Sequence, residues 1–290
     1  MGASIYLIQA MHGLVYGMLL FLVASGLTLV FGMMGVLNIA HAAFYMLGAY
    51  FSYSLVAWTG NFWLCLILAP IAVGIFGAFV ERVLLRRIHI LGHAYELMLT
   101  FGIFYVIVEA VRWIWGTYPL TVRVPAILAG SIPFMGAIYP VYRLFILFIA
   151  IIVLVMLAFL LLKTRIGITI RAAVFDAEMV DILGINVPRV FLGVFSIGSA
   201  LAGLAGVVAG PFLSTYPGMG LDILIDTFVV IVVGGFGSLG GTLVASLMIG
   251  ELQSFGVLFI PTLALVFQFL LDPTIFESFL YPYPNLLLIS

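Results

Sequence analysis

Long apolar runs separated by short polar stretches follow one another along the whole chain. A helix needs roughly 20 apolar residues to cross the hydrocarbon of a bilayer. Several runs approach that length, whereas a transmembrane barrel would show segments of about ten residues with alternating hydrophobicity. The pattern predicts an all-α, polytopic integral membrane protein with about eight to nine transmembrane helices, over residues 5–31, 42–58, 62–84, 94–115, 142–162, 190–212, 223–235, 242–259 and 262–271.

Composition agrees with this class. Of the 290 residues, 66% are hydrophobic and only 7% are charged, whereas a soluble domain usually carries about 25% charged residues. The single cysteine, Cys65, excludes a disulfide within the chain and suggests no metal cluster. The first basic residue is Arg82, so the basic start of a cleavable signal peptide is missing and we expect the first helix to be retained.

Basic residues predict the orientation, because loops on the cytoplasmic side carry an excess of Lys and Arg. Seven of the ten Lys and Arg residues fall in two clusters, at 82–87 and 163–189. Two predicted spans separate these clusters, so both can lie on the inner side. The loop 116–141, rich in Pro and Gly, then faces outward and is expected to be structured by turns. Counting back through three spans places the N-terminus outside.

Two glycine-rich segments, 32–41 and 234–241, interrupt the helical pattern inside apolar sequence, one in each half of the chain. Such paired interruptions are typical of a transport site between repeats, although glycines can also serve close helix packing. The first segment contains polar side chains in apolar surroundings, where they cost free energy. Their presence therefore favours a break with a function. We predict that Asn38 and His41 hold this break and that, with Phe44, they lie along a translocation path.

The most polar stretch of the chain is the loop 163–190, which lies between two apolar runs. Placed on one helix at 100° per residue, its residues 171–183 form an apolar stripe typical of an amphipathic helix. Gly184 suits the left-handed end of that helix, and Pro188 prevents its continuation into the next span. The stripe consists of Ala172, Phe175, Met179, Ile182 and Leu183.

This amphipathic helix has two possible partners. A helix lying on the bilayer surface would carry Lys and Arg on its polar face, but 172–183 contains only acidic charges, which anionic lipid repels. The loop therefore favours docking to a cytoplasmic protein. The residues expected to take part are Arg171, Ala172, Phe175, Asp176, Glu178, Met179, Leu183 and Gly184.

Four stretches resemble one known family: GLTLVFGMMGVLNIAHAAFYMLGAY (26–50), KTRIGITIRAAVFDAEMVDILGINVPRV (163–190), SIGSALAGLAGVVAGP (196–211) and GGFGSLGGTLVASLMIGELQSFG (234–256). They are similar to the permease subunits of ABC importers, specifically the branched-chain amino acid (Liv-type) family. The stretches are spread over nearly the whole chain, so the resemblance implies one permease domain over 1–290, in a bacterial inner membrane.

The resemblance also implies partners. These are a second permease subunit, homologous or identical, two cytoplasmic ATP-binding subunits, and an extracytoplasmic solute-binding protein that delivers the substrate. It implies that the loop 163–190 carries the coupling helix that sits in a groove of the ATPase. It implies no cofactor and no nucleic acid, and the expected solute is a branched-chain amino acid. Urea, short amides and aromatic acids are alternatives that related permeases are thought to carry.

The chain has no Walker A pattern, so it is not itself expected to be an ATPase. Its glycine-rich segment 234–241 lacks the Lys and Ser or Thr that such a loop needs. A membrane enzyme is disfavoured because neither a Ser-His-Asp pattern nor a two-metal spacing is visible. His89 and His93, four residues apart, are better explained as a wet interfacial pair than as metal ligands.

A secondary transporter driven by an ion gradient is the remaining alternative. It would need intramembrane carboxylates, and the candidates are Glu96, Glu109, Asp222, Asp226 and Glu251. Glu109 and Arg112 are three residues apart and predict a structural ion pair on one helix face. Asp222 and Asp226 stand where an apolar run begins, which is an ordinary place for carboxylates at the start of a helix.

Overall fold

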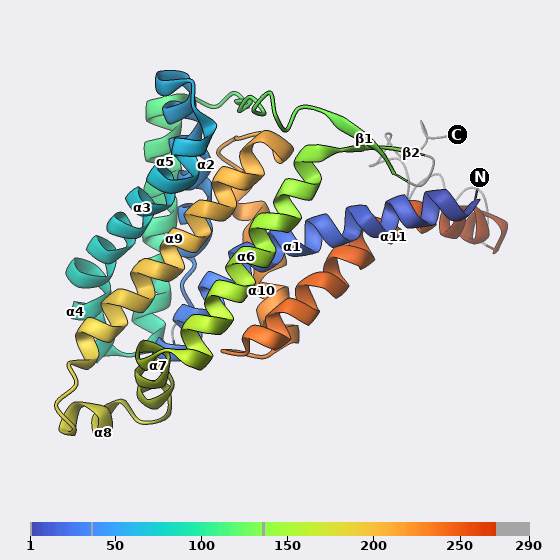
Figure 1. Cartoon of the computed structure of the whole chain (residues 1–290). Coiled ribbons are helices and arrows are strands. Elements are labelled where there is room, and N and C mark those ends of the chain that lie inside the picture. The colour runs from blue at the N-terminus through green and yellow to red at the C-terminus, as the bar shows by residue number, and fades with distance from the viewer. Residues whose placement is uncertain (1, 36, 135–136, 271–290) are drawn as a thin grey trace.

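The computed structural model is almost entirely helical and describes residues 2–35, 37–134 and 137–270 (Figure 1). Its long helices are α1 (Gly2–Met34), α2 (Ala40–Thr59), α3 (Phe62–Val80), α5 (His93–Trp115), α6 (Val141–Lys163), α9 (Val187–Leu213), α10 (Met219–Gly234) and α11 (Leu239–Leu270). Short helical segments complete it: η1 (Glu81–Leu85), α4 (Arg86–Ile88), η2 (His89–Leu91), α7 (Arg165–Phe175) and α8 (Ala177–Ile182). The all-α class predicted from the apolar pattern is confirmed.

The number of crossings is not confirmed as eight or nine. Among the described residues, five segments are long and apolar enough to span a membrane: Ile5–Met34, Phe62–Ile88, His93–Trp115, Val141–Lys163 and Val187–Leu213. With 16 residues, α10 is about 24 Å long, which is shorter than a hydrocarbon core of about 30 Å.

The prediction of two separate C-terminal spans is wrong. Segments 242–259 and 262–271 belong to one helix, α11, which runs to Leu270; position 271 lies outside the described residues. Pro261 stands at the expected interruption. Prolines are tolerated inside membrane helices because neighbouring groups can satisfy the freed backbone.

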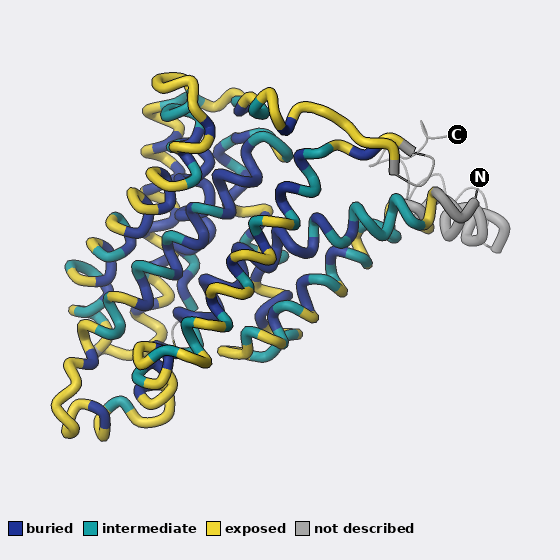
Figure 2. Tube along the Cα trace, viewed as in Figure 1, coloured by how far each residue is buried: buried dark blue, intermediate teal, exposed yellow. Residues whose placement is uncertain are grey.

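The core of the molecule lies around α1, α2 and α9. In the most apolar part of α1, 83% of the residues are buried, against 28% in α6 at the periphery, and Figure 2 shows the same contrast between centre and edge. A Cβ atom at Gly206 of α9 would collide with the carbonyl oxygen of Tyr45 in α2. The two backbones therefore pack in direct contact, as small residues allow in membrane helices.

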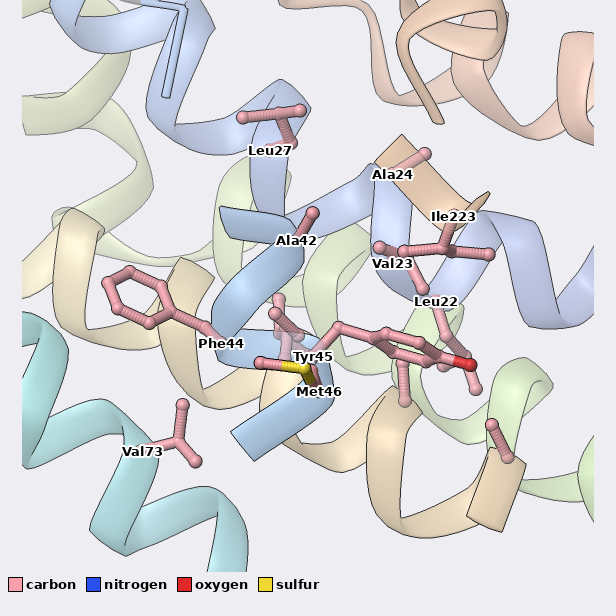
Figure 3. Close-up of a cluster of buried hydrophobic side chains, with 14 of the residues drawn as sticks. Leu22, Val23, Ala24, Leu27, Ala42, Phe44, Tyr45, Met46, Val73 and Ile223 are labelled. Atoms are coloured by element: carbon pink, nitrogen blue, oxygen red, sulfur yellow. The ribbon is translucent and has the colours of Figure 1, made fainter. Parts of the chain in front are cut away.

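Large apolar side chains fill the space around this contact. Figure 3 shows Tyr45 of α2 extending toward Leu22 and Val23 of α1, whereas Phe44 of α2 points to the opposite side, where Val73 of α3 lies. All five are buried. The centre is therefore tightly packed, and its helices are held by close contact between apolar surfaces.

The two basic clusters meet at one end of the molecule. Arg86 donates a hydrogen bond of 2.8 Å from Nη2 to the carbonyl oxygen of Pro188, which joins the start of α4 to the first turn of α9. Figure 1 shows α4, α7 and α8 together at this end. The expectation that both clusters share one side is therefore confirmed.

The loop between α5 and α6 lies at the opposite end. It contains a hairpin of β1 (Ser131–Phe134) and β2 (Ala137–Pro140), and its Leu120 pairs with Thr215 in the segment that follows α9. The hydroxyl of Tyr139 donates to the carbonyl oxygen of Met11 at 3.2 Å. The N-terminal part of α1 is thus on the side of this loop, as the orientation argument requires.

Candidate functional site: a broken helix pair and a protruding loop

The first predicted interruption is a true break between helices. The helix α1 ends at Met34, Gly35 adopts a left-handed φ of +65°, and α2 begins at Ala40. Glycine takes this φ more readily than any other residue, so Gly35 lets the chain turn at this point. The break lies at the same end of the molecule as the basic clusters, since Gly35 is close to His93.

The three predicted path residues are all buried. His41 lies within hydrogen-bonding distance of α1, with 3.0 Å between its Nε2 and the carbonyl oxygen of Val23. Asn38 is 1% exposed, and neither its amide nitrogen nor its amide oxygen has a partner among the described residues. Phe44 packs edge-on against Phe76 and Phe195. None of the three lines the cavity described below, and their role in a path stays a prediction.

Asn38 therefore does not hold the break through its side chain as we expected, whereas His41 does contact the neighbouring helix. A residue that the sequence reasoning missed takes the place of Asn38. The hydroxyl of Thr100 in α5 accepts from the backbone N–H of Ile39 at 3.4 Å, and it lies 3.5 Å from the carbonyl oxygen of Leu37 and 3.1 Å from that of Leu97 in its own helix. The available signal was a threonine within the otherwise apolar stretch 97–108 of this helix.

The same face of α5 carries a buried carboxylate. Glu96, one turn before Thr100, is 1% exposed and pairs with two histidines, His89 and His93. The distance between its Oε2 and Nδ1 of His93 is 3.2 Å. The histidine pair thus contacts a carboxylate, and in the described part of the chain no three His, Cys, Asp or Glu side chains gather so that they could hold a metal ion.

The second glycine segment meets the end of α1. Gly235 and Gly237 have φ values of +84° and +77° in the turn between α10 and α11. A Cβ atom on Gly32 would lie 2.8 Å from Cα of Gly237, so the two backbones touch. Nearby, the hydroxyls of Thr28 and Thr242 are 2.8 Å apart. The two interruptions, some 200 residues apart in sequence, are neighbours in space.

The protruding loop is built differently from the single helix we predicted for 171–183. It forms two helices, α7 and α8, with Asp176 between them in extended conformation. The carboxylate of Asp176 accepts from the N–H of Met179 at 2.9 Å and caps α8. An aspartate competes for backbone donors in this way and favours helix starts over helix interiors, which is why the helix breaks there.

Polar side chains also begin the helices on either side. The hydroxyl of Thr164 caps α7 by accepting from Gly167, and the side chain of Asn186 caps α9 by accepting from Arg189. Gly184 has a φ of +84°, which confirms the left-handed helix end expected there. Pro188 stands in the first turn of α9, so it starts the next helix as well as ending the loop.

The tip of the loop exposes large apolar side chains to an unusual extent. Phe175 is 95% exposed, Ile182 74%, Leu183 72% and Met179 53%. Ala172, Asp176, Glu178 and Asp181 are exposed beside them. Contiguous exposed apolar residues with a polar rim mark interaction sites. We name this patch, made of Phe175, Met179, Ile182 and Leu183, the docking surface, and its role in docking stays a prediction.

Arg171 belongs to another surface. It lines a cavity of about 580 Å³ between α1, α6, α7 and the α10–α11 turn. Among the described residues, Arg171 has no hydrogen bond or ion pair. The helix α7 therefore forms part of a cavity wall with one face and leads into the docking surface at its end.

The remaining carboxylates mostly have partners. Glu109 and Arg112 form the expected ion pair at 2.6 Å. Asp222 lies in the first turn of α10 as predicted, and its carboxylate accepts from Tyr216 in the preceding loop. That hydrogen bond and partial burial raise the pKa of Tyr216 to about 12. An ion pair of 2.9 Å between Glu81 and Arg86 was not foreseen.

Two comparisons place the chain among known proteins. Residues 9–271 match the model of the family described as branched-chain amino acid transport system, permease component. The chain is similar to the high-affinity branched-chain amino acid transport system permease protein BraD of Pseudomonas aeruginosa, at 29% identity over 87% of this chain and 86% of that protein. It is also similar to the permease protein LivH of Salmonella typhimurium, at 28% identity over 89% and 88%.

A search of solved structures gave no match. The family match covers far more than half of the sequence and both glycine-interrupted segments together with the loop between α6 and α9. The chain belongs to the family of permease components of branched-chain amino acid transport systems.

Proposed function

We propose that the chain is the membrane permease subunit of a binding-protein-dependent ABC importer that moves branched-chain amino acids into the bacterial cytoplasm. The observation that carries this proposal is the docking surface, which is apolar, exposed and rimmed by acidic residues at the end with the basic clusters. The family match and the names of the similar permeases support the substrate class. Energy comes from a partner, since the chain has no phosphate-binding loop.

The complete transporter in this proposal contains two permease subunits, two cytoplasmic ATP-binding subunits and an extracytoplasmic binding protein. Each docking surface sits in a groove of one ATP-binding subunit. Phe175 is the central anchor, because a few residues in well-packed, desolvated pockets carry most of the binding energy of an interface and Phe175 is the most exposed side chain of the docking surface. The acidic residues Glu178 and Asp181 face basic side chains of the ATPase.

The connections of the loop suggest how movement passes into the membrane. A Cβ atom at Gly167 would collide with backbone carbonyl oxygens at the end of α6, so α7 turns back directly against α6. At the other end, the loop runs into α9 within a few residues of Gly184. Closure of the ATPase pair would pull on the loop and tilt both α6 and α9, which opens the permease pair inward.

The predicted path residues enter this mechanism through the break between α1 and α2. In the described conformation Asn38, His41 and Phe44 are buried. We propose that these three residues lie beside the path after α1 and α2 have moved. The unpartnered amide of Asn38 is then the group that gains a partner.

Transport in membrane vesicles tests the proposal. Vesicles that contain the complete transporter, trapped ATP and the binding protein should accumulate leucine, isoleucine and valine. The same vesicles with a proton or sodium gradient and no ATP should not. Accumulation driven by the ion gradient alone would replace the proposal with a secondary transporter, and preferential uptake of urea or aromatic acids would change the solute.

A further inference from the structure

The cavity lined by Arg171 lies between the parts of the chain that the proposed mechanism sets in motion. Its walls come from α1, α6, α7 and the α10–α11 turn, and its volume of about 580 Å³ is in the range of small-molecule sites. The contact between Gly32 and Gly237, where the two interruptions meet, forms one of its edges. Figure 1 shows α7 beneath the end of α6 at this place.

Most of the lining is aliphatic. Among the side chains that contribute apolar surface are Leu29, Met33, Leu154, Leu157, Leu161 and Ile170, and the aromatic ring of Phe236 joins them. Branched hydrocarbon groups pack well against such walls, whereas urea or a short amide would leave them uncovered. The lining therefore selects an aliphatic side chain of moderate size.

Two features of opposite electrical sign complete the cavity. Arg171 supplies a guanidinium without a partner among the described residues, and this group matches a carboxylate in a bidentate manner. Gly32 and Met33 belong to the last turn of α1, and the C-terminal end of a helix carries partial negative charge. The hydroxyls of Ser25 and Thr28 lie in the same wall. A molecule with a carboxylate, an ammonium group and an aliphatic side chain fits all three surfaces.

We propose that this cavity binds the transported aliphatic amino acid at the inner part of its path, with Arg171 holding the carboxylate and α7 acting as a movable wall. The identity of the ligand rests on the proposed function. Because Ile170, Arg171 and Val174 of α7 line the cavity while Phe175 belongs to the docking surface, ATPase movement changes the cavity directly.

Protection of a cysteine tests the site without requiring transport. In the complete transporter carrying Cys65→Ala, Ala158→Cys places a thiol in the cavity wall. Ile168→Cys is the matched control, because Ile168 is 58% exposed on α7 and lies outside the cavity lining. Labelling of this chain by a small thiol reagent is followed with 10 mM leucine, 10 mM isoamylamine, which lacks the carboxylate, or neither.

Leucine should slow labelling of Ala158→Cys by about tenfold if the Kd is near 1 mM, and isoamylamine should have little effect. Neither compound should protect Ile168→Cys. Arg171→Gln should weaken the leucine affinity by about ten- to a hundredfold, the range for a hydrogen bond to a charged group, and Arg171→Lys should retain part of it. Equal protection by both compounds, equal protection of both thiols, or full protection in Arg171→Gln would overturn the proposal.

A second arm separates this inference from the proposed function. A non-hydrolysable ATP analogue should change the labelling rate of Ala158→Cys, and Phe175→Asp should abolish that change while leucine protection remains. Leucine protection without any nucleotide effect would support the site and overturn ATPase coupling. A nucleotide effect without leucine protection would support coupling and overturn the site.

Discussion

The break between α1 and α2 and the loop between α6 and α9 lie at the same end of the molecule, but they reverse the usual distribution of side chains in opposite ways. At the break, Asn38 and His41 are polar and almost completely buried. On the loop, Phe175 and Ile182 are apolar and largely exposed. Burying a polar group and exposing a large apolar patch both cost free energy, so each region needs a reason beyond the stability of this one chain.

The two regions differ in where their stabilising contacts must come from. The buried polar groups are enclosed by other helices of the same chain. Any additional hydrogen bond to them must therefore form in another conformation of this chain. The exposed apolar groups can be removed from water only by contact with another molecule. Changes on the loop should therefore affect assembly, and changes at the break should affect transport in an assembled complex.

The largest effect is expected from Phe175→Asp. A charge at the centre of an apolar interface loses the anchor and must itself be desolvated, which together cost at least about 3 kcal/mol. Association with the ATP-binding subunit, measured by co-purification, should fall at least a hundredfold, and ATP-driven uptake should disappear. Phe175→Leu is the matched control and should keep most of the association. If Phe175→Asp assembles and transports normally, the docking surface is not the contact.

Gly184→Leu should have the next largest effect on the loop. No atom lies within 4 Å of the position where a Cβ would be placed, so the substitution acts through the φ of +84° and not through a collision. A branched residue in this conformation costs about 1–2 kcal/mol, which should lower ATPase association several-fold. Gly184→Asn tests the cause, because asparagine tolerates left-handed backbone, and it should stay close to wild type. A loss of the same size in both variants would contradict the conformational explanation.

At the break, Asn38→Leu should separate stability from function. The amide has no partner among the described residues, so its replacement by an apolar group of similar size should leave the melting temperature equal or higher. Uptake by the assembled transporter should nevertheless fall several-fold at matched expression, because the amide is needed in the moved state. Normal uptake would leave Asn38 without a role in the path.

Thr100→Val should give the smallest effect. It removes the hydroxyl that contacts Leu37 and Ile39 at the break and the carbonyl oxygen of Leu97 in its own helix, and the expected loss is about 1 kcal/mol in the free energy of unfolding. Thermal unfolding of the purified complex measures it, with Thr169→Val on the loop as a control for the loss of a hydroxyl. No change at Thr100 would show that the break is held by packing alone.

Much of the fold could be predicted because each helix is marked locally. The α5, α6 and α9 boundaries fall within three residues of the predicted spans, since long apolar runs end at polar or glycine residues. The left-handed Gly184 and the Glu109–Arg112 pair follow from short-range rules as well. These features need only the sequence within a few residues of the site.

Other features could not be predicted because they depend on groups far apart in the chain. The cavity joins residues from Ser25 to Gly240, and Thr100 reaches the break from a different helix. The division of the loop at Asp176 is an intermediate case. A capping residue followed by Glu178 was a visible signal for a helix start, but the apolar periodicity continues through it and predicts one helix.

The most direct test of the central claim is the reactivity of a thiol at the tip of the loop. In the Cys65→Ala background, Ile182→Cys should not react with an impermeant reagent added outside right-side-out vesicles, whereas Ser131→Cys in the hairpin should react. In inside-out vesicles, Ile182→Cys should be protected while the ATP-binding subunits are bound and become reactive once they are stripped off. Reaction of Ile182→Cys from outside would contradict the account, because a cytoplasmic ATPase could not then reach the docking surface.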